Sequence, residues 1–196
     1  MVTTVKLRVD NLLLATDFSA CSARALGFAL GIAGRYGAKL HLLHCVDPVP
    51  YNLLTPEAVE MACDAARRDM RDLESDIRGS GLARDIEVEG TIEAAAVEAV
   101  LPPFVKLHDI GLIVIGTHGR TGWRKLVLGS VAESIMDQVA CPVLTVGPAS
   151  DRTRIQHFGP ENILVATDGS EGADRAVDVA AEIAYRRNWW RSLRVL

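Results

Sequence analysis

The chain has 196 residues, of which 49% are hydrophobic and 23% are charged, and this composition excludes a disordered or fibrous protein. Its formal net charge of −4 and its isoelectric point of about 5.7 give no overall attraction to anionic surfaces, so we expect neither nucleic acid nor a membrane as a partner. The amino terminus lacks the apolar run of a signal peptide, and no segment approaches the roughly 20 apolar residues that span a bilayer, which favours a cytoplasmic protein.

Apolar runs and helical patterns alternate along the chain. Strands are expected at 11–15, 39–46, 85–89, 112–116 and 142–146. Helices are expected at 20–36, from 56 to about 79–81, at 91–101 and at 130–139. We expect Gly90 to end the third strand, and Pro102 with Pro103 to interrupt the third helix. Continuous apolar strands that alternate with helices predict a parallel sheet that is covered on both faces.

Capping residues mark the first two helices. Ser19 is a suitable N-cap for the first helix, and Gly37 is placed to end it with a left-handed backbone. Thr55, Pro56 and Glu57 have the order of N-cap, first-turn proline and first-turn acid, which predicts the start of the second helix.

An internal repeat organises the whole chain. The sequence NLLLATDFS at 11–19 returns as NILVATDGS at 162–170, and an alanine-rich helical pattern follows both copies. The repeat predicts a complete domain at 1–147, a linker at 148–161 and the start of a second, truncated copy at 162–196.

Cysteine and histidine spacing gives no sign of a metal site. The four cysteines are widely separated and form no CxxC pair, which favours reduced, mostly buried thiols. His41 and His44 are three residues apart in an expected strand, so their side chains are expected on opposite faces. We therefore expect no metal-binding site formed by the side chains of the protein.

The segment 116–130, GTHGRTGWRKLVLGS, carries the main functional signal. It leaves the fourth strand at the carboxyl edge of the sheet, where open parallel sheets bind ligands, and Asp17 follows the first strand at the same edge. Glycines at 116, 119 and 129 let the backbone approach an anion. Ser130 opens a helix whose unpaired N–H groups and dipole favour phosphate.

The same residues also have explanations without a ligand. Ser130 and Glu133 form a capping box that satisfies the helix by itself, and Arg120, Arg124 and Lys125 fit a solvated basic loop. The chain has no GxxxxGK[ST] loop, and no GxGxxG follows its first strand. These absences disfavour a P-loop NTPase and a dinucleotide dehydrogenase.

The complete spacing G-x2-G-x9-G-S from Gly116 to Ser130, together with TDFS after the first strand, resembles the ATP-binding branch of the universal stress protein family. The resemblance covers residues 8–147 as a complete domain, and the ATDGS copy resembles the start of a tandem member with a truncated second domain. It implies an α/β fold of the adenine nucleotide alpha hydrolase-like type. That fold has a five-stranded parallel sheet in the order 3-2-1-4-5, with helices on both faces.

The resemblance also implies a site for ATP, with or without bound Mg²⁺. Asp17 would contact the ribose or base region, and the adenine pocket would be lined by Ala15, Thr16, Cys45 and Val46. The ribose and phosphates would be surrounded by Gly116, His118, Gly119, Arg120, Gly129, Ser130 and Val131. Ala15 stands where ATP-binding relatives often have proline, a change that a backbone-lined pocket tolerates.

Three functions fit this reading of the sequence. The first is a nucleotide-dependent regulator of the stress response that acts on an unknown protein partner through a homodimer, which pairs along its last strand from Pro142 to Val146. The second is slow ATP hydrolysis or autophosphorylation, with Asp17 or His118 as base, although no efficient catalytic set is visible and we assign no catalytic residue. The third is an interaction module that pairs chains without nucleotide.

Overall fold

The structure is a computed structural model. It describes residues 9–48, 55–81, 83, 85–116, 135, 138–139, 141–147, 163–165, 170, 176–178, 180–181 and 193–195. Contacts divide the chain into two units, one with strands β1 to β5 and the other with strands β6 and β7.

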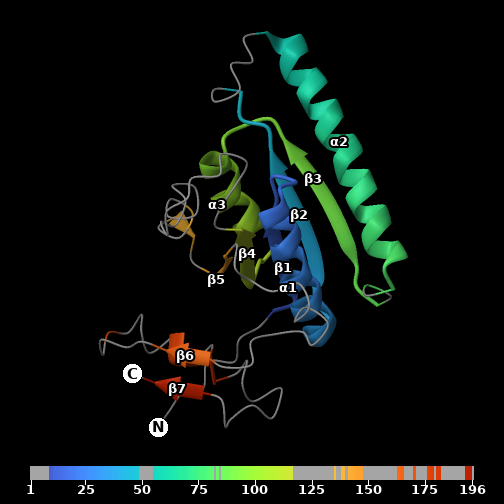
Figure 1. The fold of residues 1–196 in the computed structure, drawn as a ribbon. Helices are drawn as coiled ribbons and strands as arrows, with labels where there is room; N and C mark the ends of the chain where they lie inside the picture. The colour runs from blue at the N-terminus through green and yellow to red at the C-terminus, as the bar shows by residue number, and fades with distance from the viewer. Residues whose placement is uncertain are drawn as a thin grey trace. The chain divides into compact units, whose positions relative to one another are not determined.

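The larger unit alternates strands and helices along the chain (Figure 1). Its elements are β1 (Asn11–Ala15), α1 (Ala20–Tyr36), β2 (Lys39–Cys45), α2 (Pro56–Gly79), β3 (Val88–Glu93), α3 (Val97–Leu107), β4 (Leu112–Gly116) and β5 (Val143–Val146). Ile135 and Gln138, which fall in the expected helix 130–139, are also helical.

The five strands form one parallel sheet in the order β3-β2-β1-β4-β5, which confirms the expected fold. β1 lies at the centre, where Leu12 pairs with Leu40 of β2 on one side and with Leu112 of β4 on the other. The chain thus builds outward from β1 in one direction and then in the other. This arrangement places a reversal of strand order between β1 and β4, at the carboxyl edge of the sheet.

Burial on both faces of the sheet explains the continuous apolar strands. Leu12, Leu13 and Leu14 are all fully buried. Leu13 packs in a cluster with Leu101 and Phe104 of α3, whereas Leu14 faces a cavity between α1 and α2. Helices therefore cover both faces, as the alternation of strands and helices predicts.

The capping residues predicted for the first two helices are confirmed. The Ser19 hydroxyl accepts a hydrogen bond from the Ser22 N–H at the start of α1, and Gly37 ends this helix with a φ of 64°. At α2 the Thr55 hydroxyl accepts from the Ala58 N–H, with proline in the first turn. These caps satisfy N–H groups that have no partner within the helix.

The expectation that Gly90 ends the third strand is wrong. β3 continues through Gly90 to Glu93, because each of its residues pairs with a residue of β2. A Cβ atom at position 90 would lie 2.5 Å from Cγ of Met70, so the glycine allows α2 to pack closely over the strand. The residues 91–93, expected in a helix, are therefore strand, and α3 begins at Val97.

The expectation that Pro102 and Pro103 interrupt the third helix is also wrong, since α3 passes through both prolines and ends at Leu107. Leu101 and Phe104 lie on either side of the two prolines and are 1% and 7% exposed. Their burial in the core favours the helical path, although each proline removes a helical N–H donor.

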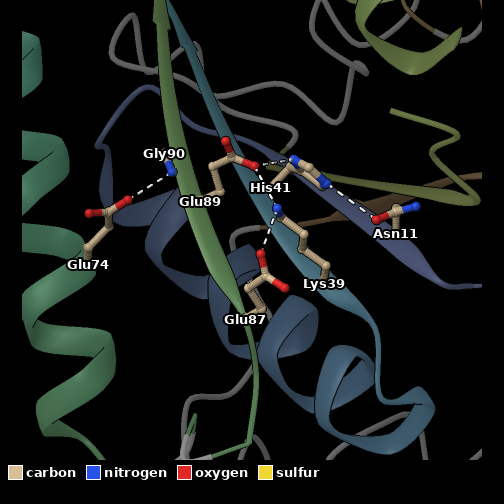
Figure 2. Close-up of polar contacts among 7 residues, drawn as sticks. All are labelled: Asn11, Lys39, His41, Glu74, Glu87, Glu89 and Gly90. Atoms are coloured by element: carbon tan, nitrogen blue, oxygen red, sulfur yellow. Dashed lines mark hydrogen bonds and ion pairs between the residues drawn. The ribbon is translucent and has the colours of Figure 1, made fainter. Parts of the chain in front are cut away.

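A polar network occupies the amino-terminal edge of the sheet, where β1 and β2 begin, opposite to the carboxyl edge (Figure 2). Lys39 Nζ lies 2.7 Å from a Glu87 carboxylate oxygen and 2.8 Å from one of Glu89. His41 lies between Glu89 and Asn11, with its Nε2 3.4 Å from Asn11 Oδ1 and its Nδ1 3.6 Å from Glu89 Oε2. The sheet thus ends at this edge in a charged cluster.

Two histidines of β2 lie on opposite faces, as the strand alternation predicts. The His41 ring contacts Phe104 and His108 beside α3, whereas the His44 ring contacts Phe18 in the loop after β1. Burial lowers the pKa of His41 below its ordinary value, and the nearby His108 lowers it further.

The smaller unit contains a parallel pair of short strands, β6 (Ile163–Val165) and β7 (Leu193–Val195). Residues 176–178 and 180–181, which lie between these strands in the sequence, are helical. The described part of this unit thus has the order strand, helix, strand. No helix among the described residues of the chain is both long and apolar enough to cross a membrane.

Candidate functional site

Three strands of the larger unit, β1, β2 and β4, end side by side at the carboxyl edge of the sheet. Ala15 ends β1 and pairs with Leu43 of β2 and with Ile115 of β4. The Thr16 N–H then donates to the Leu43 carbonyl at 2.9 Å, which keeps the chain beside β2 for one further residue. Of the residues expected at the site, Ala15, Thr16, Asp17, Cys45, Val46 and Gly116 therefore lie at one edge.

The remaining expected residues lie outside the described part of the chain. They are His118, Gly119, Arg120, Gly129, Ser130 and Val131. The described residues of the candidate site follow β1 and β2 or stand at the ends of β1, β2 and β4.

The loop from Thr16 to Ser19, which we call the β1–α1 loop, is held by hydrogen bonds of its own side chains. The Thr16 hydroxyl accepts from the Phe18 N–H at 3.1 Å and donates to the Ser22 hydroxyl at 3.1 Å. The Asp17 carboxylate accepts from the Ser19 N–H at 3.0 Å. Thr16 is 8% exposed. Its buried side chain therefore forms hydrogen bonds within the loop, and its backbone lies at the carboxyl edge of the sheet.

Phe18 and His44 form a contact that the sequence did not indicate. Phe18 has a φ of 58°, in the left-handed region that bulky residues rarely adopt. Its ring centroid lies 4.6 Å from that of His44, and His44 Nδ1 lies 2.7 Å from the Thr16 carbonyl oxygen. The only signal in the sequence was the position of His44 near the end of an expected strand, on the face opposite His41.

Cys45 and Val46, at the end of β2, have side chains directed to opposite faces. Cys45 packs beside the cluster under α3, and burial together with the nearby Glu93 carboxylate raises the pKa of its thiol to about 12. Val46 packs against Cys63 of α2 and is 3% exposed. The Cys45 thiol is therefore protonated at neutral pH and unsuited to nucleophilic chemistry.

Gly116 lies directly under the first turn of α1. A Cβ atom at this position would be 3.0 Å from the carbonyl carbon of Cys21 and 3.1 Å from the Ser22 nitrogen. The glycine thus allows the start of α1 to approach the end of β4. This packing role is independent of any ligand.

A cavity of about 380 Å³ lies between α1 and α2 and adjoins the β1–α1 loop. It is lined by Leu14, Thr16, Phe18, Ser19, Ser22, Ala23, Leu26, Asp69, Asp72, Leu73 and Asp76. The loop therefore borders open space on the side of α2. Among the described residues, no group of three His, Cys, Asp or Glu side chains is placed to hold a metal ion.

The strand order and the glycine at the end of β4 define a doubly wound α/β protein. In such proteins, ligands bind at the carboxyl edge of the sheet. The model of the universal stress protein family matches residues 8–147. The chain therefore belongs to the universal stress protein family.

The chain is also similar to individual relatives in sequence and to solved structures in fold. The chain is 26% identical to universal stress protein MJ0531 of Methanocaldococcus jannaschii over 137 residues, which cover 69% of this chain and 81% of the relative. The fold resembles a universal stress protein from Archaeoglobus fulgidus DSM 4304, with a TM-score of 0.67 and 20% identity over 92% of this chain and 65% of that one. It also resembles a universal stress protein in complex with cAMP, with a TM-score of 0.51 and 21% identity over 72% of this chain and 99% of that one.

Proposed function

We propose that the chain binds an adenine nucleotide, ATP in the first place, at the carboxyl edge of its sheet. The observation that carries the proposal is the meeting of the β1–α1 loop, the end of β2 and Gly116 at the point where the strand order reverses. Ligands of open α/β sheets bind at such a point. The cAMP complex of a protein with this fold supports an adenine nucleotide as the ligand class.

The described residues fit the adenosine part of such a ligand. Asp17 is oriented by the Ser19 N–H and would accept from the ribose or base. Thr16 and Val46 have buried side chains, so they would line the adenine pocket through their backbones, beside Ala15 and Cys45. Apolar surroundings with a few placed polar groups are typical of nucleotide pockets.

The phosphates would lie on the segment that follows β4. Gly116, Gly119 and Gly129 leave room for the backbone, and Ser130 with Val131 would offer N–H groups at a helix start. His118 and Arg120 add hydrogen-bond donors near the ribose and phosphates. Mg²⁺, when bound with ATP, neutralises phosphate charge, and the chain itself supplies the backbone cradle.

We further propose that this binding serves regulation in the stress response through a homodimer. β5 is an edge strand of the sheet, and its residues from Val143 to Thr145 are only half-buried. Pairing with a second copy would cover this apolar edge. The residues 162–196 would belong to a second copy of the domain after a linker at 148–161, because the pair β6 and β7 repeats the parallel pairing of β1 with β2.

The proposal is tested by equilibrium dialysis with radiolabelled ATP and Mg²⁺. Wild type should bind about one ATP per chain, and Gly129→Ala should bind more weakly because its methyl group intrudes on the phosphates. Gly79→Ala is the control, since a Cβ atom there meets nothing within 4 Å. Equal binding by wild type and Gly129→Ala would remove the glycine segment from the site.

The dimer is tested separately by sedimentation equilibrium. Wild type should have twice the mass of one chain, and Val143→Lys should shift it toward the monomer because a lysine on an edge strand opposes pairing. A monomeric wild type would contradict the dimer and leave the nucleotide site unaffected.

A further inference from the structure

The β1–α1 loop contains a strained residue at the edge where the nucleotide is proposed to bind. Phe18 has a φ of 58°, in the left-handed region, which is unfavourable for a residue with a side chain. Such a conformation persists only when the surrounding structure holds it, and it is often found at functional sites. Within the loop, the Thr16 hydroxyl holds the Phe18 N–H and the Asp17 carboxylate holds the Ser19 N–H.

His44 holds the same loop from the neighbouring strand at two points. Its Nδ1 lies 2.7 Å from the Thr16 carbonyl oxygen, and its ring packs on the Phe18 ring at an interplanar angle of 39°. A carbonyl oxygen only accepts hydrogen bonds, so Nδ1 must carry the proton in this contact. His44 thus connects β2 to the backbone of Thr16, which precedes Asp17, and to the side chain of Phe18, which follows it.

The apolar surroundings of Phe18 complete the arrangement. Phe18 packs beside a cluster of Val46, Cys63 and Ala66, so the loop, the end of β2 and α2 share one contact region. Loss of the His44 ring would therefore remove one contact from the Phe18 ring and one from the Thr16 carbonyl, while the hydrogen bonds within the loop remain. Asp17 lies between these two residues, so its direction depends on both sets of contacts.

We infer that His44 is a positioning residue for nucleotide binding, and that its contacts with Thr16 and Phe18 fix the direction of Asp17. The inference rests on the proposed function. His44 acts through the loop, whereas Asp17 meets the nucleotide.

The test compares His44 variants with a matched histidine on the same strand. His44→Leu removes the donor, and His44→Asn returns an N–H donor near the position of Nδ1. His41→Leu is the control, because His41 is also in β2 but lies on the opposite face beside α3. Each variant is measured by calorimetric titration with ATP and Mg²⁺ and by urea unfolding.

We expect His44→Leu to weaken ATP binding about tenfold, the effect of one well-placed hydrogen bond. His44→Asn should restore most of this loss. His41→Leu should lower the stability to unfolding and leave the dissociation constant for ATP within about twofold, because its contacts do not reach the loop. In wild type, ¹⁵N NMR of the imidazole should show the Nδ1–H tautomer of His44.

The outcomes separate the inference from the proposed function. If wild type binds ATP and His44→Leu binds it equally well, the inference fails alone. It also fails if His44→Asn is as weak as His44→Leu, or if the Nε2–H tautomer is found. If His44→Leu does not fold, His44→Gln replaces it, because its longer amide reaches the Nε2 position, and equal affinity of the Gln and Asn variants overturns the inference. Absence of ATP binding to wild type overturns both proposals.

Discussion

Gly116 ends β4 where the first turn of α1 comes into van der Waals contact with it. A Cβ atom at this position would lie 3.0 Å from a backbone carbon of Cys21, which cannot move without the rest of α1. The same glycine was expected to serve phosphate approach. Packing thus gives a reason for this glycine that applies with or without nucleotide.

Gly116→Ala should therefore destabilise the protein by about 1–3 kcal/mol, the usual cost of an added methyl group in a packed region. Gly79→Ala is the matched control at the end of α2, where the added methyl meets no atom within 4 Å beyond the adjacent residues and backbone of its own helix, and it should be neutral or slightly stabilising. Urea unfolding measures both variants. Wild-type stability for Gly116→Ala would show that α1 does not press on this residue.

His41 predicts a dependence of stability on pH. Its pKa is lowered by burial and by His108, so the unfolded chain binds a proton more readily than the folded one below the ordinary value of 6.5. Lys39 lowers this pKa further, whereas Glu89 and Glu87 oppose the shift. The contribution of neutral His41 is present above pH 6.5 and is lost as the pH falls toward its folded pKa.

Urea unfolding between about pH 7.5 and 5.0 measures this effect, since the ordinary histidine pKa lies inside that range. The free energy of unfolding of wild type should fall on acidification, and His41→Gln should show a smaller fall. The stabilising contribution of Glu89 is present throughout this range and is lost only at lower pH, because Lys39 lowers the pKa of its carboxyl from the ordinary value of 4.5. Identical pH slopes for wild type and His41→Gln would rule out His41 as the source.

At the scale of elements, β3 is an edge strand whose backbone is partly covered by α2. The Gly90 N–H donates to the Glu74 carboxylate at 2.8 Å, and Figure 2 shows this side chain reaching from the helix to the strand. The Glu74 carboxylate thus provides an acceptor for the Gly90 N–H, which has no further strand beside it at the edge of the sheet.

Glu74→Ala should cost about 1–2 kcal/mol, because it leaves the partly buried Gly90 N–H without this acceptor. Glu74→Gln retains an amide oxygen and should recover most of the loss. Chemical denaturation separates the two variants, and hydrogen exchange at Gly90 reports the contact directly. Equal stability of the alanine and glutamine variants would contradict a role for the hydrogen bond.

Local signals predicted most of the fold because they act within a few residues. Ser19, Gly37 and Thr55 mark helix ends by their own hydrogen bonds or backbone conformation, and the sequence shows them directly. Gly90 and the two prolines of α3 misled the prediction because tertiary packing overrides local preference there. The close approach of Met70 and the burial of Leu101 cannot be read from the neighbouring residues.

The candidate site was predictable in part for the same reason. The rule for parallel sheets places Asp17, Val46 and Gly116 at one edge once the strand order is known. The contact of His44 with Phe18 depends on a positive φ at a bulky residue, which no sequence pattern indicates. The packing of Gly116 under α1 likewise needs coordinates.

At the scale of the whole molecule, the family match covers residues 8–147, and the larger unit contains all five strands of the sheet. We predict that a chain ended after Gly147 unfolds in one cooperative transition and keeps its affinity for ATP. Circular dichroism during thermal unfolding and an ATP titration of the shortened chain check this. A shortened chain that does not fold would show that residues after 147 belong to the core.

Binding of ATP by the wild-type chain is the central claim, and one calorimetric titration with ATP and Mg²⁺ tests it most directly. The account predicts saturable heat with about one nucleotide per chain, because the proposal places one site at the carboxyl edge of the sheet in the larger unit. Absence of binding heat at several temperatures would contradict the account. The glycine segment 116–130 would then have only a structural explanation.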